Sequence, residues 1–365
     1  MGKKLIQLEN ITKTYDGNMI LDDLNLYVKE NEFLTLLGPS GCGKTTTLRL
    51  IGGFETPDTG RIIFDGKDIT SLPPNERKLN TVFQKYALFT HMSIADNIAF
   101  GLKISKKSKA YIQDKIKYAL KLVNLDGYEN RSIDSLSGGQ QQRIAIARAI
   151  VNEPKVLLLD EPLGALDLKM RQDMQYELIR LKNELGITFI YVTHDQEEAL
   201  TMATKVCVMK EAKIQQIDTP EMIYDCPVNT FVANFIGEST VIPATIRGIR
   251  EGKITAVFDK DDRLFEVDCK RRDYWAGLNK KVNFIIRPEK VKIVKEDYDG
   301  IKFPARITSC AFLGDTFRVN VITDSGIEFK MKVFSRGHYD LSVGNRLWVG
   351  VRPYDMVLVR YDDEI

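Results

Sequence analysis

The chain has 365 residues, of which 44% are hydrophobic and 28% charged, an ordinary soluble-protein composition with room for two or three domains. Its 52 basic and 50 acidic residues leave a formal charge of +2, so it lacks the broad basic field that attracts nucleic acid. No apolar run reaches the roughly 18 residues of a membrane span, and the opening MGKKLI forms no signal peptide, so we expect any membrane role to come through a partner.

The cysteines are odd in number, widely scattered and without a C-x-x-C pair. They are Cys42, Cys207, Cys226, Cys269 and Cys310. This spacing indicates neither a disulfide framework nor a zinc site, and it favours a reducing cytoplasm.

Residues 1 to about 235 alternate strand-like and helical runs, which predicts an α/β sheet. Within them, residues 38–45 read GPSGCGKT and satisfy the pattern G-x-x-x-x-G-K-[ST] between a strand-like run at 32–37 and a helical segment. The glycines let backbone N–H groups surround phosphates, with Lys44 on the β- and γ-phosphates, Thr45 on Mg²⁺ and Thr46 at the α-phosphate. The alternative is a glycine turn before an ordinary helix.

A second glycine pair lies at 136–140, LSGGQ, directly before the helical run QQRIAIARAIV. Ser137, Gly138 and Gly139 would expose N–H groups at a helix N-terminus, which again suits an anion. Because the chain already has one phosphate loop, this second site is better suited to a nucleotide held by another subunit.

The run VLLLD at 156–160 is typical of a fully buried parallel strand that ends in a carboxylate. Ligands of such sheets bind beyond the carboxyl ends of the strands, so Asp160 is placed to hold Mg²⁺ through water. Glu161 is the candidate that orients or deprotonates the attacking water. Alone, an Asp-Glu pair is as often surface charge; the phosphate loop favours the catalytic interpretation.

Together, LSGGQ with QQR, LLLDEP, GALD at 164–167 and THD at 193–195 resemble the nucleotide-binding subunits of ABC transporters. The resemblance implies a P-loop NTPase with a RecA-like core and a helical ABC subdomain at about 88–152, over residues 1–236. It also implies ATP and Mg²⁺ as cofactors and a head-to-tail homodimer in which each LSGGQ closes over the other subunit's nucleotide. Integral membrane permease subunits and, indirectly, an extracytoplasmic solute-binding protein are implied as partners, without nucleic acid, at the cytoplasmic face of the membrane.

The resemblance assigns further roles to single positions. Tyr15 is similar to the aromatic residue that stacks on adenine, Gln84 to the glutamine that touches Mg²⁺ and senses the membrane partner, and His194 to the switch histidine at the γ-phosphate. Asp167 resembles the aspartate that crosses the dimer interface. The expected nucleotide-binding set is Tyr15, Gly38, Pro39, Ser40, Gly41, Cys42, Gly43, Lys44, Thr45, Thr46, Ser137, Gly138, Gly139, Gln140 and Asp167; the catalytic set is Glu161, His194, Lys44 and Gln84, with Thr45, Gln84 and Asp160 at the metal.

Residues 237–365 change to short β-rich runs separated by turns, which predicts a small all-β barrel or sandwich. The resemblance to ABC transporter subunits implies an OB-like barrel domain here. In it, IIRPEKVKIV at 285–294 matches GVRPYDMVLV at 350–359 in the Arg-Pro pair and the apolar positions behind it. We interpret the match as two related β units; coincidence between two strand ends is the alternative. The domain resembles the accessory barrel of ABC importers.

The stretches GGFETPDTG, NTVFQKYALF and GITFIYVTHDQEEALTM are most similar to ATPases of polyamine importers and less so to maltose-type ones. Two alternatives stay open: an ATPase of a sugar or other importer, and an ABC-type ATPase without a transport role. A phosphate-binding structural module fails to explain why Asp160, Glu161 and His194 accompany the glycine loop. The apolar residues Phe83, Ala87, Leu88, Phe89 and Met92 form either a groove for a helix of the membrane partner or part of the subdomain core.

Overall fold

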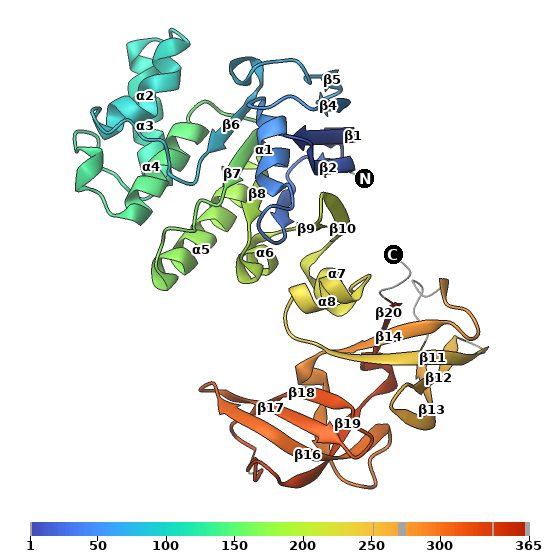
Figure 1. Cartoon of the computed structure of the whole chain (residues 1–365). Coiled ribbons are helices and arrows are strands. Elements are labelled where there is room, and N and C mark those ends of the chain that lie inside the picture. The colour runs from blue at the N-terminus through green and yellow to red at the C-terminus, as the bar shows by residue number, and fades with distance from the viewer. Residues whose placement is uncertain (1, 251, 269–274, 338, 362–365) are drawn as a thin grey trace. The chain divides into compact units, whose positions relative to one another are not determined.

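The computed structural model describes residues 2–250, 252–268, 275–337 and 339–361, and in it the chain divides into two compact units, Met1–Pro220 and Glu221–Ile365 (Figure 1). The division falls after the first residue of α7 (Pro220–Asp225), which together with α8 (Thr230–Phe235) precedes the expected domain boundary at 236. Cys42, Cys207, Cys226 and Cys310 form no disulfide with one another; Cys269 lies outside the described residues.

The first unit contains a four-stranded antiparallel sheet and a six-stranded, mainly parallel sheet. The antiparallel sheet has the order β2-β1-β4-β5, with strands β1 (Lys4–Tyr15), β2 (Asn18–Lys29), β4 (Thr59–Phe64) and β5 (Lys67–Asp68). The parallel sheet has the order β10-β9-β3-β8-β7-β6, with strands β3 (Phe33–Leu37), β6 (Leu79–Val82), β7 (Val156–Asp160), β8 (Thr188–Thr193), β9 (Lys205–Lys210) and the antiparallel edge strand β10 (Lys213–Asp218). The strands expected at 32–37, 156–160 and before His194 are confirmed.

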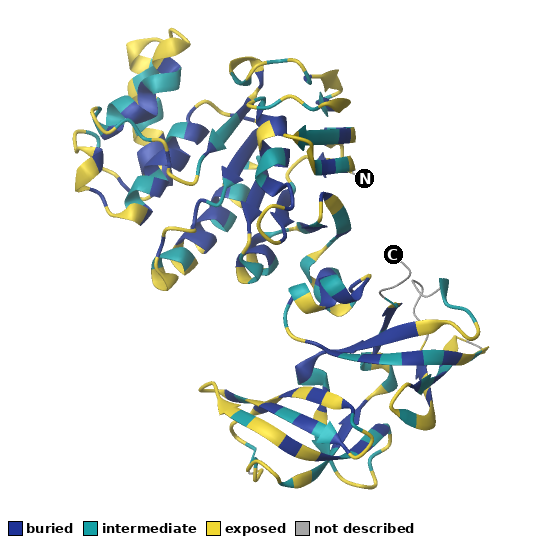
Figure 2. Cartoon of the chain, viewed as in Figure 1, coloured by how far each residue is buried: buried dark blue, intermediate teal, exposed yellow. Residues whose placement is uncertain are grey.

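Side chains of the central strands alternate between two cores, as the period of two in a strand requires. Leu158 of β7 packs with α1 (Lys44–Gly52) and the antiparallel sheet, whereas Leu157 and Leu159 pack against α4 (Gly138–Ile150) and α5 (Leu168–Leu185). Both faces are therefore covered, and Figure 2 shows these strands as continuously buried. This burial explains the unbroken apolar runs of the sequence.

A third core belongs to the helical subdomain, in which α2 (Ile94–Ile104), α3 (Lys109–Leu122) and α4 pack on one another. Each of these helices begins at a serine whose hydroxyl accepts a backbone N–H: Ser93, Ser108 and Ser137. Such caps satisfy orphan N–H groups and fix where a helix starts. The short helix α6 (Gln196–Met202) is capped in the same way by Asp195.

The second unit holds two five-stranded antiparallel sheets that enclose one apolar core. The orders are β13-β12-β11-β14-β20 and β18-β17-β16-β19-β15. The arrangement of the four strands β11–β14 is thus repeated by β16–β19. The fifth strand of each sheet comes from the other repeat: β20, which follows β19, pairs with β14, and β15, which follows β14, pairs with β19. The bounds are β11 (Thr240–Arg250), β12 (Lys253–Phe258), β13 (Asp261–Asp268), β14 (Lys281–Ile286), β15 (Lys292–Val294), β16 (Ile301–Phe312), β17 (Thr316–Thr323), β18 (Glu328–Phe334), β19 (Arg346–Val351) and β20 (Val357–Arg360). Two related β units are thus confirmed.

The repeated Arg-Pro pairs mark the points where the chain crosses between the sheets. Arg287 and Arg352 have nearly equal backbone angles (φ −76°, ψ 145° and φ −83°, ψ 141°), and each is followed by a 3-10 turn that begins at proline. Proline suits that first position because its φ is already fixed and its missing N–H is not needed there.

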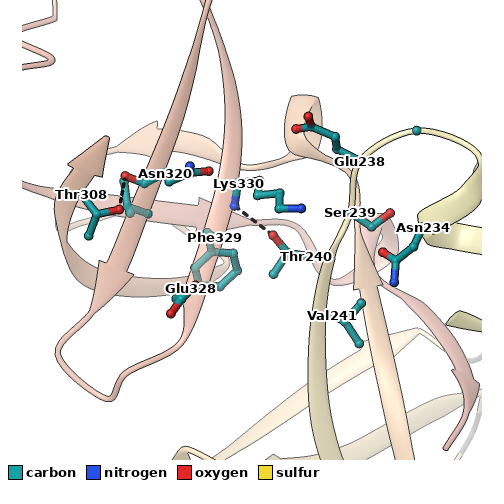
Figure 3. Close-up of a pocket in the computed structure, with 12 residues that line it drawn as sticks. Asn234, Glu238, Ser239, Thr240, Val241, Thr308, Asn320, Glu328, Phe329 and Lys330 are labelled. Atoms are coloured by element: carbon teal, nitrogen blue, oxygen red, sulfur yellow. Dashed lines mark hydrogen bonds between the residues drawn. The ribbon is translucent and has the colours of Figure 1, made fainter. Parts of the chain in front are cut away.

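One face of the second unit is hollowed by a cavity of about 580 Å³. Figure 3 shows that the α8–β11 connection lines one side and β17 and β18 the other, with the backbone N–H of Lys330 donating to the Thr240 hydroxyl at 3.0 Å. Its lining is mostly hydroxyl, amide and charged groups, and Glu238 is paired with Arg318 at 3.2 Å.

Candidate functional site

The glycine loop lies between β3 and α1, in the context that its sequence predicts. Gly38 and Gly43 are required by space: a Cβ on Gly38 would lie 2.3 Å from the Met209 carbonyl oxygen, and one on Gly43, at φ +99°, would lie 2.6 Å from that of Ile20. Only glycine avoids both contacts, so the loop can hold its N–H groups around an anion. Pro39, Ser40 and Gly41 form its exposed edge.

Lys44 is a buried cation at the start of α1, with 6% of its surface exposed. Its Nζ donates to the carbonyl oxygens of Gly38 at 2.7 Å and Pro39 at 2.8 Å. In the part of the chain that the structure describes, no carboxylate oxygen lies within 4.0 Å of this ammonium group. A buried charge is costly without a counter-charge, so the loop is suited to an anionic ligand such as a triphosphate.

Thr45 and Asp160 meet beside the loop. The Thr45 hydroxyl donates to Asp160 Oδ1 at 3.1 Å, across the start of α1 and the end of β7. Burial is the main cause that raises the pKa of Asp160, and the neighbouring charge of Glu161 adds to it. Hydroxyl and carboxylate oxygens are the hard ligands that Mg²⁺ prefers, and a cation would relieve this desolvated carboxylate.

Glu161, Gln84 and His194 converge from the ends of three adjacent parallel strands, β7, β6 and β8. Gln84 Nε2 donates to Glu161 Oε2 at 3.3 Å, and His194 Nδ1 lies 3.1 Å from Glu161 Oε1. Glu161 itself has φ +43°, an uncommon backbone conformation for a residue with a side chain. The carboxylate is therefore held from two sides next to the Asp160–Thr45 pair.

Tyr15, at the end of β1, lies beside Thr46, the second residue after Lys44. The residue is 37% exposed, and Lys13 Nζ lies 5.2 Å from the centroid of its ring. Burial first, and then the charge of Glu55, raises the pKa of the Tyr15 hydroxyl, with a hydrogen bond to Thr46 acting against them. A partly exposed aromatic face is thus available next to the phosphate loop.

The LSGGQ segment and the GALD loop lie next to each other. Ser137 caps α4 and forms a capping box with Gln140, with N–O distances of 3.4 and 3.0 Å. Asp167 caps α5 by accepting from Met170 N at 2.9 Å. A Cβ on Gly139 would lie 3.5 Å from Met170 Sδ, so the starts of α4 and α5 pack together.

Two residues near this site were not predicted from the sequence. Arg171 donates to the Leu166 carbonyl oxygen and to Asp195 Oδ2, each at 3.2 Å, and Glu198 accepts from the Tyr191 hydroxyl at 2.7 Å. Glu198 carries a sequence signal, since it stands three residues after its helix cap Asp195 as in a capping box. Arg171 carries none, because its partner Asp195 lies 24 residues away in the sequence.

The apolar residues after β6 have mixed environments. Leu88 packs against both the core around α4 and α5 and the core of the helical subdomain. Phe83 is half-buried, and its ring lies 5.3 Å from that of the exposed Phe54. The Phe89 ring lies 4.5 Å from that of Phe100. Both interpretations of this segment thus have support: Leu88 belongs to the core, while Phe83 and Phe89 leave an aromatic surface. None of the described helices has the length and apolar character needed to cross a membrane.

Comparisons with known proteins identify the family of the chain. The ABC transporter family matches residues 21–164, and the TOBE domain family matches 284–359. The chain is 53% identical to the spermidine/putrescine import ATP-binding protein PotA of Acetivibrio thermocellus over 98% of this chain and 96% of that one. It is 49% identical to the protein of the same name from Clostridioides difficile over the full length of both.

Solved structures share the fold of the first unit. The cbiO1 protein of Clostridium perfringens, part of the ABC transporter complex cbiONQ, has a TM-score of 0.57 and 32% identity, over 60% of this chain and 90% of that one. A dimeric ATP-binding cassette bound to ADP and Pi in a post-hydrolysis state has a TM-score of 0.54 and 32% identity, over 59% and 99%. The chain belongs to the ABC transporter ATPases, in the family of the spermidine/putrescine import ATP-binding proteins.

Proposed function

We propose that this ATPase couples ATP hydrolysis to the import of polyamines, and that the predicted residues carry out its steps. One observation carries the proposal: the buried ammonium group of Lys44, which has no carboxylate partner among the described residues, lies in a glycine loop beside the Thr45–Asp160 pair, and Glu161 follows directly. This arrangement supplies a cation that binds phosphate, oxygen ligands for Mg²⁺ and a general base for the attacking water, all at one edge of a parallel sheet.

Binding of ATP uses the glycine loop and the exposed tyrosine. The Tyr15 ring stacks on the adenine, the loop N–H groups surround the phosphates, and Lys44 exchanges its two carbonyl acceptors for phosphate oxygens. Charge-assisted bonds to phosphate are stronger than those to neutral carbonyls, which drives that exchange. The loop positions are Gly38, Pro39, Ser40, Gly41, Cys42, Gly43, Thr45 and Thr46.

Thr45, Asp160 and Gln84 fit a Mg²⁺ site, because they offer hydroxyl, carboxylate and amide oxygens at the edge of the loop. Bound Mg²⁺ would neutralise charge on the phosphate oxygens. The raised pKa of Asp160 has burial as its main cause, so a cation beside it favours the ionised carboxylate.

Hydrolysis then requires a water aligned with the γ-phosphorus. Glu161 accepts a proton from that water as the new P–O bond forms and the bond to the bridging oxygen breaks, giving ADP and phosphate. Gln84 and His194 hold the two carboxylate oxygens of Glu161, and the exposed ring of His194 is free to turn toward the γ-phosphate. Both contacts orient the base before the reaction, which lowers the entropy cost of alignment.

Two copies of the chain act together in this proposal. Ser137, Gly138, Gly139 and Gln140 of one copy close over the γ-phosphate held by the other, while Asp167 crosses the interface. Support comes from the exposure of Ser137 and Gly138 at the capped start of α4 and from the dimeric cassette that shares the fold. Loss of the γ-phosphate removes the shared anion, so the copies separate.

The polyamine assignment is supported by the names of the relatives, and it implies permease subunits in the membrane. This chain would attach peripherally at the cytoplasmic face, near Gln84 and the aromatic surface of Phe83 and Phe89, and a solute-binding protein outside the membrane would deliver the polyamine. Net charge near zero gives no support to nucleic acid as a partner. Sugar import by a maltose-type system is the second candidate.

The test uses cells whose only copy of the chain carries Lys44→Ala. Uptake of labelled spermidine and putrescine is expected to be lost, with uptake of labelled maltose unchanged. Loss of maltose uptake with normal spermidine uptake would instead favour the sugar importer. Recovery of ribosomes in place of membrane proteins with the purified chain would favour an ABC-type ATPase without a transport role.

A further inference from the structure

Arg171 connects two loops that approach the site from different strands. It lies in the first turn of α5, where Nη2 donates to the carbonyl oxygen of Leu166 in the loop after β7, at 3.2 Å. Its Nη1 donates to Asp195 Oδ2 in the loop after β8, also at 3.2 Å. One planar guanidinium group therefore bridges the GALD loop and the loop of His194 and Asp195, which we call the histidine loop.

Both loops also contact Glu161. Gly164 N donates to the Glu161 carbonyl oxygen at 3.3 Å, and His194 Nδ1 lies 3.1 Å from the Glu161 carboxylate. Arg171 and Glu161 line the same small cavity of about 40 Å³, so the bridge and the proposed base border one space. The cavity wall is completed by Gly164, Thr193, His194, Asp195 and Glu198.

The far end of the bridge is firmly fixed. Asp195 Oδ1 accepts the backbone N–H groups of Glu197 at 2.8 Å and Glu198 at 3.2 Å, so its other oxygen is held toward Arg171. The Glu198 carboxylate, 4% exposed, accepts from the Thr193 hydroxyl at 2.6 Å and lies 3.9 Å from Arg171 Nε. A buried carboxylate with a nearby cation makes the histidine loop costly to displace from Arg171.

We propose that Arg171 is a positioning residue that fixes the spacing of the GALD and histidine loops around Glu161. The proposal rests on the proposed role of Glu161. Arginine suits this task because its fork donates in two directions at once, whereas lysine offers a single flexible charge. Since Asp167 of the same loop reaches the second copy in the proposed dimer, closure of that interface is passed through Arg171 to His194.

The test measures ATP hydrolysis and binding of a fluorescent ATP analogue by the full chain with Arg171→Met, Arg171→Lys, Asp195→Asn and the combination of Arg171→Met with Asp195→Asn. Each single change is expected to lower kcat about tenfold or more while the analogue's Kd stays within about twofold, because misplacement affects alignment and not the phosphate grip. Asparagine still caps α6 through its amide oxygen, so that variant keeps the cap and replaces the carboxylate oxygen that faces Arg171 with an NH2 group. The double variant is expected to be no slower than the slower single variant, as for two ends of one bridge.

Arg180 provides a matched control on the same helix, since it pairs with Glu177 and Glu184 and does not line the cavity beside Glu161. Arg180→Met is expected to lower the Tm with kcat retained. A wild-type kcat for Arg171→Met or Arg171→Lys, or losses that simply multiply in the double variant, would overturn the bridge. If Glu161→Gln hydrolyses ATP normally while the Arg171 losses remain, the role of Glu161 is wrong and the bridge acts on another group.

Discussion

His194 Nδ1 lies 3.1 Å from Glu161 Oε1, although the two residues stand 33 positions apart in the sequence. They meet because β7 and β8 are parallel neighbours whose carboxyl ends open at the same edge of the sheet. The other carboxylate oxygen of Glu161 accepts from Gln84, at the end of β6, the next strand in the same sheet. The contacts that hold the Glu161 carboxylate therefore depend on the order of β6, β7 and β8 in the sheet.

Glu161→Gln is expected to retain ATP binding and to lower kcat about a hundredfold or more, because the amide has the size of the carboxylate and cannot accept the proton. ATP should then hold two copies together, measured as a dimer by size-exclusion chromatography with light scattering. Glu184→Gln, at an exposed position of α5, serves as the control and should turn over normally. Normal hydrolysis by Glu161→Gln would remove Glu161 from the role of base.

Lys44→Ala is expected to weaken ATP binding at least about tenfold, since it removes a buried charge-assisted bond to phosphate. Binding of ATP raises the Tm of the native protein by mass action, so the shift in Tm at a fixed ATP concentration reports the affinity. Lys155→Ala, which removes an exposed lysine paired with Asp65, should keep the full shift. If ATP shifted the Tm of Lys44→Ala as much as that of the unchanged chain, the proposed role of Lys44 in binding phosphate would be contradicted.

Local features of the site could be predicted from the sequence. The glycine loop, the strand before Asp160 and the helix after LSGGQ depend on neighbouring residues, and all three are observed. Asp160, Glu161 and His194 follow strand-like runs, so the rule for parallel sheets already places them at a common edge.

Non-local pairing could not be predicted in the same way. Arg171 meets Asp195 only because α5 packs over the loop after β8, and no periodicity in either segment encodes that contact. The repeated Arg-Pro segments indicated two β units, yet the exchange of β15 and β20 between the sheets depends on hydrogen bonds between distant strands. Sequence patterns specify which residues form a strand and seldom which partner it selects.

Ser137→Arg is expected to block ATP retention in trans, because the proposed site combines the glycine loop of one copy with the LSGGQ of the other. The test uses heterodimers purified through two different tags, in the Glu161→Gln background. One Lys44→Ala copy paired with one Ser137→Arg copy should retain labelled ATP at one site, whereas a copy with both changes paired with an otherwise unchanged copy should retain none. The reverse pattern would mean that each copy completes its own site.

Phe89→Asp is expected to uncouple ATP hydrolysis from uptake, because it places a charge on the aromatic surface proposed for the permease. Spermidine uptake in cells should fall, while the purified chain keeps its Kd for ATP. Phe89→Leu, which stays apolar, should retain most of the uptake. Loss of ATP binding by Phe89→Asp would instead assign Phe89 to the subdomain core, where its ring already contacts Phe100.

Arg287→Met is expected to destabilise the second unit by about 3 kcal/mol, because buried carbonyl groups lose their donor. Arg287 is 4% exposed, and its guanidinium donates to the carbonyl oxygens of Tyr224, Ala233 and Ile236, which ties α7 and the end of α8 to β14. Arg352 occupies the same place in the second repeat but is exposed, so Arg352→Met is a matched control.

The measurement is amide hydrogen exchange in α8 together with the thermal unfolding of the full chain. Faster exchange in α8 is expected for Arg287→Met alone, with the Kd for ATP unchanged in both variants, since the glycine loop belongs to the other unit. Equal exchange in the two variants would mean that the repeated Arg-Pro pair contributes only its backbone turn, and that the buried guanidinium group does not hold the helices.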